Sequence, residues 1–163
     1  MNEILLIGAG GHARACIDVI EQNGSFAVAG LVDNNVPINQ EVLGYPIIGT
    51  DSELKQLHSK FEFALVSIGQ IKSPAPRMGV YHQLKEIGYI LPTIVSPTAY
   101  VSRHATVGEG TIVLHGAIVN ANSVVGCNCI VNSRALIEHD AVVGDYCHIS
   151  TGALINGQVN VGE

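Results

Sequence analysis

Charged residues are scarce in this 163-residue sequence, at 13%, and basic residues are the rarer kind. Lys and Arg number 8 against 14 Asp and Glu, which gives a net charge of −6. A chain of this charge lacks the basic patch that general nucleic-acid binding requires. No run of basic residues provides an electrostatic membrane anchor either. Hydrophobic residues make up 47%, so the chain is too apolar for disorder and can bury a substantial core.

Targeting, membrane-spanning and zinc-binding signals are also missing. The N-terminus has no basic segment and no small-residue cleavage site, so we identify no signal peptide. No apolar stretch is long enough to span a bilayer. The cysteines Cys16, Cys127, Cys129 and Cys147 do not have a zinc-binding spacing. We therefore expect a cytoplasmic protein with reduced thiols, no membrane insertion and no metal site.

Residues 1–91 alternate short apolar strands with helical segments. This order predicts an α/β, Rossmann-like domain with a small parallel sheet. We expect the second helix to begin at Asp51, acting as its cap, and the third to end at Gly88. Strands are expected at 4–7, 26–32, 47–48 and 63–68, and helices at 13–21, 51–59 and 77–87.

From Pro92 onward the sequence has a strict period of six. Every sixth residue from Val95 to Val161 is Val or Ile. A second column, two positions before these residues, is small at every repeat from Ala99 to Ala153. Glycine recurs every 18 residues, so three hexapeptides form one coil. The pattern predicts a parallel β-helix over residues 92–163 with aliphatic columns inside. One corner would carry glycine, which tolerates backbone geometry that is costly for other residues. These glycines are Gly108, Gly126, Gly144 and Gly162.

A glycine-rich turn follows the first predicted strand and opens the first helix. Its backbone N–H groups could hold a phosphate at the helix N-terminus. Gly8, Gly10 and Ala13 fit the dinucleotide fingerprint, and Asp33 lies where a ribose-binding acid belongs. NAD binding is therefore an open alternative for this domain. About 90 residues are nevertheless too few for two full mononucleotide-binding halves.

His139 is the candidate catalytic residue of the second domain, because it follows Ile137 by two positions and should lie at an outer corner. Neutral imidazole is suited to removing a proton during acyl transfer. A neighbouring carboxylate, Asp140 or Glu138, could fix its tautomer. His148 lies half a coil further on, so the two histidines would face one site only in a groove between neighbouring subunits.

The segments LLIGAGGHA and LVDNN, followed by the hexapeptide repeats, resemble the sialic acid and bacillosamine acetyltransferase family (NeuD/PglD-like) over essentially the whole chain. The resemblance implies a nucleotide-sugar-binding domain at 1–91 and a left-handed β-helix at 92–163. It also implies acetyl-CoA as co-substrate and a homotrimer. Family members continue with further coils and a tail that carry part of the coenzyme A site, so we expect this sequence to be shortened at its C-terminal end.

The same resemblance assigns roles to individual residues. His139 would be the base, with Asp140 assisting it, and His148 would lie near the acetyl group. Gly157 matches a glycine whose backbone N–H stabilises the oxyanion, and Asn132 matches an asparagine close to the catalytic histidine. Residues implied to contact the nucleotide sugar are Gly10, Gly11, His12, Asp33, Asn34 and Gly69.

The reaction implied by the resemblance is N-acetylation of a UDP-linked 4-amino-4,6-dideoxy sugar for surface glycan synthesis. O-acetylation of sialic acid is an alternative within the same chemistry. A non-catalytic nucleotide-sugar-binding or trimerisation module, and an NAD-binding regulatory module, are alternatives of other classes.

Overall fold

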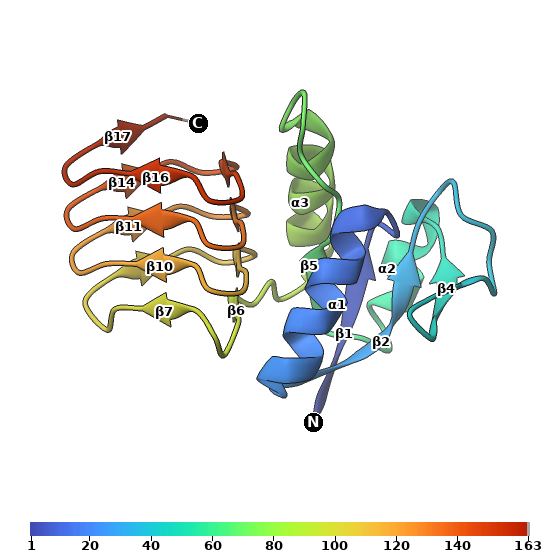
Figure 1. Ribbon diagram of the computed structural model, residues 1–163. Helices are drawn as coiled ribbons and strands as arrows, with labels where there is room; N and C mark the ends of the chain where they lie inside the picture. The colour runs from blue at the N-terminus through green and yellow to red at the C-terminus, as the bar shows by residue number, and fades with distance from the viewer. Residues whose placement is uncertain (163) are drawn as a thin grey trace. The chain divides into compact units, whose positions relative to one another are not determined.

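The computed structural model describes residues 1–162 and divides into two compact units, Met1–Pro92 and Thr93 onward. Figure 1 shows alternating strands and helices in the first unit and stacked coils in the second. Within the described residues, no helix combines the length and apolar character that crossing a bilayer requires.

The first unit is a five-stranded sheet in the order β3-β4-β2-β1-β5. Its central strands pair in parallel, as predicted, whereas β3 pairs antiparallel with β4 in a short hairpin that the sequence analysis did not predict. The strands are β1 (Asn2–Ile7), β2 (Phe26–Val32), β3 (Glu41–Val42), β4 (Tyr45–Gly49) and β5 (Phe63–Val66). The helices are α1 (Gly11–Asn23), the 3-10 helix η1 (Asp51–Glu53), α2 (Leu54–Leu57) and α3 (Ala75–Ile87).

The first helix, α1, packs through one buried apolar face. The apolar face of α1, which consists of Ala13, Cys16, Ile17 and Ile20, is buried together with Val19. Helix α3 ends at Gly88, as predicted, and the Gly88 N–H donates to the Leu84 carbonyl.

The predicted cap at Asp51 is wrong. Thr50 precedes the helical turn, and its backbone N–H donates to the Glu53 carboxylate at 2.8 Å. An acid at the third helical position can bind that otherwise unsatisfied donor, which Asp51 does not reach.

The second unit is the predicted left-handed parallel β-helix. Each coil has three strands of two residues, and each strand pairs in parallel with the strand 18 residues later. One sheet contains β6 (Ile94–Val95), β9 (Ile112–Val113), β12 (Ile130–Val131) and β15 (His148–Ile149). The second contains β7 (Tyr100–Val101), β10 (Ile118–Val119), β13 (Leu136–Ile137) and β16 (Leu154–Ile155). The third contains β8 (Thr106–Val107), β11 (Val124–Val125), β14 (Val142–Val143) and β17 (Asn160–Val161).

The second residue of every strand belongs to the aliphatic column inside the prism, as the period of six predicts. Val113, Val131 and Ile149 are among the buried members of this core. Small residues fill the corners between them. A column of hydroxyl and thiol groups at one corner also donates to the carbonyl of the glycine 15 residues ahead in the chain. The bonds are Thr93–Gly108 (2.9 Å), Thr111–Gly126 (2.8 Å), Cys129–Gly144 (3.2 Å) and Cys147–Gly162 (2.9 Å).

The glycine column is required for a different reason from the one the sequence suggested. Positive φ angles fall instead at another set of positions, every sixth residue from 110 to 158: Gly110, Gly116, Asn122, Asn128, Arg134, Asp140, Tyr146, Gly152 and Gln158. Gly108 and Gly126 are needed for close approach, since a Cβ on Gly108 would lie 2.6 Å from the carbonyl carbon of Gly126. Side chains in this column would force the coils apart.

Replacing Gly126 by alanine should therefore destabilise the β-helix. The added Cβ would lie 2.6 Å from the Asp145 backbone nitrogen and 2.7 Å from the Gly144 carbonyl carbon. Overpacking against backbone typically costs about 1–3 kcal/mol, which urea unfolding of Gly126→Ala would measure. Gly162→Ala is the matched control, because a Cβ there meets nothing within 4 Å. Equal stability of the two variants would contradict the steric explanation.

Candidate active site

A cavity of about 330 Å³ lies at the carboxyl ends of β1, β2 and β5 in the first unit. This is the edge of a parallel sheet at which α/β proteins bind ligands. Its lining combines the glycine turn that opens α1 with polar residues that follow β2 and β4. The lining residues include Gly8, Ala9, Gly10, Asp33, Asn34, Asn35, Asp51 and Gly69.

The Asp33 side chain, at the end of β2, hydrogen-bonds to the glycine turn. Its Oδ2 atom accepts the Ala9 backbone N–H at 2.8 Å. Its Oδ1 atom accepts the backbone N–H groups of Asn35 and Val36 at 2.8 and 3.1 Å. Both carboxylate oxygens therefore bind backbone donors, and Asp33 shapes the cavity wall as well as lining it.

Asn34 and Asp51 form a reciprocal pair on the same wall. The Asn34 amide donates to Asp51 Oδ2 at 2.7 Å, and the Asp51 backbone N–H donates to Asn34 Oδ1 at 3.0 Å. Of the residues that the sequence implied for substrate binding in this unit, Gly10, Asp33, Asn34 and Gly69 line the cavity. Gly11 and His12 occupy the first turn of α1.

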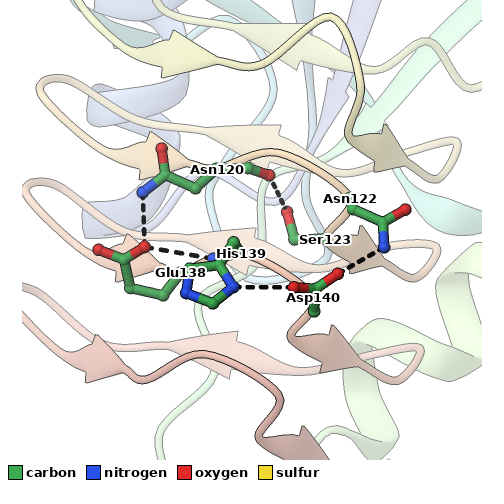
Figure 2. A network of polar contacts seen from close by, with 6 residues as sticks. All are labelled: Asn120, Asn122, Ser123, Glu138, His139 and Asp140. Carbon is green, nitrogen blue, oxygen red and sulfur yellow. Dashed lines mark hydrogen bonds and ion pairs between the residues drawn. The ribbon is translucent and has the colours of Figure 1, made fainter.

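In the second unit, His139 follows β13 and lies at a corner with its side chain 61% exposed. Asp140 has φ of +61°, in the left-handed region that Asp and Asn tolerate better than most residues. The Asp140 carboxylate accepts a hydrogen bond from His139 Nδ1 at 2.8 Å (Figure 2). In the neutral ring this bond places the proton on Nδ1 and leaves the lone pair on Nε2, the atom that can accept a proton.

The hydrogen bond between Asp140 and His139 also shifts the pKa values of both groups. It raises the pKa of His139 above the usual value, with smaller contributions from the Asp140 and Glu138 charges. The pKa of Asp140 is lowered, first by the hydrogen bond from Asn122 and then by that from His139. The arrangement therefore stabilises the imidazolium that would form after proton uptake.

Glu138, the rival carboxylate, is bound elsewhere. Its Oε2 atom accepts the Asn120 amide at 2.9 Å and the His139 backbone N–H at 3.2 Å (Figure 2). Asp140 is thus the carboxylate on the imidazole ring, and Glu138 acts on His139 only through its charge and the backbone. The sequence had left the choice between the two open.

Gly157 lies one coil beyond His139, directly against its ring. A Cβ at position 157 would be 2.9 Å from Cε1 and 3.0 Å from Nε2 of His139. The imidazole therefore occupies space that any side chain at this position would fill. The contact brings the Gly157 backbone next to the nitrogen that carries the free lone pair.

His148 and Asn132 form a second polar pair, on a different face of the prism. His148 belongs to β15, and its Nε2 lies 2.9 Å from the Asn132 amide nitrogen. Asn132 Oδ1 accepts the Ser133 backbone N–H at 2.8 Å. His139, by contrast, follows β13 in a separate sheet. Within one chain the Asn132 side chain thus contacts His148. Its expected place near His139 stays a prediction, because the site was expected between neighbouring subunits.

Sequence reasoning missed three residues that structure these sites: Asp51, Asn120 and Asn122. Asp51 was interpreted only as a helix cap. Asn120 and Asn122 stand 18 residues before Glu138 and Asp140, and each donates to the acid of the next coil. The coil period, applied to polar residues as it was to aliphatic ones, would have found both asparagines. Among the described residues, no group of three or more His, Cys, Asp or Glu side chains is placed to hold a metal ion.

Comparison with known proteins agrees with this two-part architecture. Residues 3–84 match the PglD N-terminal domain family, and residues 122–157 match the bacterial transferase hexapeptide family (six repeats). An uncharacterized protein of Acanthamoeba polyphaga mimivirus is 31% identical over 110 residues. That match covers 68% of this chain and only 21% of the viral protein.

Solved structures extend the similarity across both units. A mutant perosamine N-acetyltransferase from Caulobacter crescentus, in complex with CoA and GDP-perosamine, has a TM-score of 0.91 and 30% identity, covering 98% of this chain and 74% of its own. The acetyltransferase domain of PglB from Neisseria gonorrhoeae, in complex with acetyl coenzyme A, has a TM-score of 0.88 and 27% identity, covering 100% and 86%. WeeI from Acinetobacter baumannii, at 19% identity and a TM-score of 0.83, shares the fold.

The PglD domain match spans half of the chain, the hexapeptide match lies in the other unit, and the perosamine enzyme aligns with both. The chain therefore belongs to the PglD/NeuD-like family of hexapeptide-repeat acyltransferases.

Proposed function

We propose that this protein is an acetyl-CoA-dependent N-acetyltransferase that acts on a nucleotide-linked amino sugar. The observation that carries the proposal is the exposed His139 ring, with Nδ1 bound to Asp140 and Nε2 lying against Gly157. Two relatives add support, since one is bound to CoA and GDP-perosamine and the other to acetyl coenzyme A.

In this proposal His139 is the general base. Its Nε2 removes a proton from the sugar amine as the amine nitrogen attacks the thioester carbonyl of the donor. Collapse of the tetrahedral intermediate then breaks the C–S bond and leaves the acetyl group on nitrogen, and the imidazolium returns the proton to the coenzyme A thiolate. Asp140 holds the ring in the Nδ1–H tautomer and offsets the positive charge that the ring gains. The Gly157 backbone N–H is the candidate donor to the oxyanion of the tetrahedral intermediate. His148, with Asn132 beside it, is the candidate for orienting the acetyl group.

The cavity of the first unit is the proposed nucleotide site. The turn Gly8–Gly10 precedes the N-terminus of α1, where backbone N–H groups and the helix dipole favour a diphosphate. Gly11, His12, Asp33, Asn34 and Gly69 would complete the site. The sequence implied a UDP sugar, whereas GDP-perosamine is the ligand of the perosamine enzyme. Both nucleotides are therefore candidates.

We also propose that the protein acts as a homotrimer. Outward-facing Tyr100, Ile118 and Leu154 lie exposed along one sheet of the prism. Val124 and Val142 are exposed along the neighbouring sheet. Packing of these columns between copies would remove the apolar stripes from water. The groove between two copies packed in this way would also allow His139 of one copy to face His148 of another.

An acetylation screen tests the function directly. Mass spectrometry would follow acetyl transfer from acetyl-CoA to UDP-linked and GDP-linked amino sugars and to sialic acid. We expect transfer to an amino sugar, with His139→Gln lowering kcat by about 10²–10⁴-fold because the general base is lost. Unaltered turnover by His139→Gln would exclude the catalytic role. Nucleotide-sugar binding without turnover by the parent would favour a non-catalytic module.

The pH dependence should report the His139–Asp140 pair. The base must be neutral, so kcat/KM should rise with pH through the pKa of His139, which Asp140 holds above its usual value. Asp140→Asn removes the negative partner, so the midpoint should move to lower pH while the maximal rate falls. Kinetics across pH 5–9 would measure both effects. A midpoint that stays in place in Asp140→Asn would show that another group titrates.

Gly157→Ala tests the close contact between this position and the His139 ring. The new Cβ would lie 2.9–3.0 Å from His139 Cε1 and Nε2, so the ring has to move and its Asp140 bond weakens. We expect the His139 imidazole NMR signals to shift and the pKa of His139 to fall. Gly162→Ala is the control, because a Cβ there meets nothing within 4 Å. Unchanged His139 signals in Gly157→Ala would contradict the close contact.

A further inference from the structure

Asn122 lies one coil before Asp140, at the same corner of the β-helix, and its side chain points at the Asp140 carboxylate (Figure 2). The Asn122 Nδ2 donates to Asp140 Oδ1 at 2.5 Å, while Asp140 Oδ2 accepts from His139. Each carboxylate oxygen therefore has one donor. Asn122, Asp140 and His139 form a continuous chain of side-chain hydrogen bonds running from one coil to the next.

The position of Asn122 is fixed by the backbone. Its φ is +61°, the same left-handed geometry that Asp140 adopts, and its N–H donates to the His104 carbonyl at 3.1 Å. The two residues are thus stacked copies of one corner, 18 residues apart. Because the amide is aligned with the carboxylate by the coil register, it holds the acid without reorganisation.

Asp140 requires such support because it is exposed. Its side chain is 41% accessible, and a short carboxylate at a solvated corner can turn towards water in other rotamers. In a rotamer pointing away from the ring it would neither fix the imidazole tautomer nor stabilise the imidazolium. The hydrogen bond from Asn122 is also the first cause of the lowered pKa of Asp140.

We propose that Asn122 is a positioning residue of the active site, which acts on His139 through Asp140. The inference rests on the proposed function of His139 as base. Asn122 does not touch the imidazole. Its effect is to keep the Asp140 carboxylate charged and directed at Nδ1, so that Nε2 stays basic and correctly placed.

Few other charged groups face this chain of hydrogen bonds in the described part of the protein. Glu138 lies beside His139 and is held by Asn120. The coil before Asn122 carries His104, whose Nε2 accepts from Arg103 Nε at 3.1 Å. Gly157, in the coil beyond, contributes no charge. A change in the pKa of His139 after substitution of Asn122 would therefore be transmitted mainly through Asp140.

The test compares Asn122→Gly with the parent chain. Glycine keeps the positive φ without strain and removes only the amide. NMR titration of ¹⁵N-labelled histidine should show the pKa of His139 falling towards its ordinary value. Turnover should drop by about three- to tenfold, the net worth of one ordinary hydrogen bond, because Asn122 acts only indirectly; KM should change little for either substrate. Gln158→Gly is the matched control, since Gln158 is exposed, has φ of +62° and stands at the same corner one coil further on.

A double-variant cycle distinguishes action through Asp140 from a general effect on the coil. In an Asp140→Asn background, Asn122→Gly should cause little further change in the pKa of His139 or in kcat. An equal effect in both backgrounds would overturn the proposal, as would an unchanged pKa in Asn122→Gly alone. Asn122→Asp, which keeps the shape but cannot donate, is the second variant should glycine prevent folding, and it should also lose turnover.

The two proposals fail in different ways. If the parent transfers no acetyl group to any amino sugar, the proposed function is wrong. The NMR titration of His139 still decides whether Asn122 acts on the ring. If the parent is active and Asn122→Gly matches it in both pKa and turnover, only the positioning role of Asn122 is wrong.

Discussion

Pairing of each residue with the residue 18 positions later is the constraint on which the β-helix depends. Backbone hydrogen bonds between coils, such as Asn120 N–H to the Ile137 carbonyl, hold this register along all three faces. Because the register is uniform, side chains of one type form continuous columns. Aliphatic columns fill the interior, and glycine columns allow the coils to approach. A shift of one residue would turn every inward side chain outward.

The candidate active site is built by the same stacking. Three consecutive coils each contribute one part: Asn122 from the first, His139 with Asp140 from the second, and Gly157 from the third. No long loop is needed to assemble them, because polar residues placed 18 positions apart are already neighbours. The coil register aligns Asn122 with Asp140 and Asp140 with the exposed His139 ring, so the ring keeps a defined tautomer without packed surroundings.

The first unit, which holds the proposed nucleotide site, uses its polar residues differently. Asp33 stands where a ribose-binding acid belongs in a dinucleotide fold, yet both of its oxygens bind backbone N–H groups that shape the glycine turn. The Asn34–Asp51 pair then closes the same wall. The cavity is therefore organised before any ligand arrives, which lowers the entropic cost of binding.

The sequence by itself determined the β-helix, because a period of six in Val and Ile is compatible with few other folds, and it determined the order of elements in the first unit. It also predicted the exposed corner position of His139, which the structure shows; the catalytic role of this residue stays a proposal. Only the tertiary structure decided between Asp140 and Glu138, since both flank His139 and the choice depends on the positive φ at Asp140. Only the structure also shows that the glycine column is needed for close approach between coils, and that the Asn132 side chain contacts His148. These depend on distances between coils, which adjacent positions in a sequence do not encode.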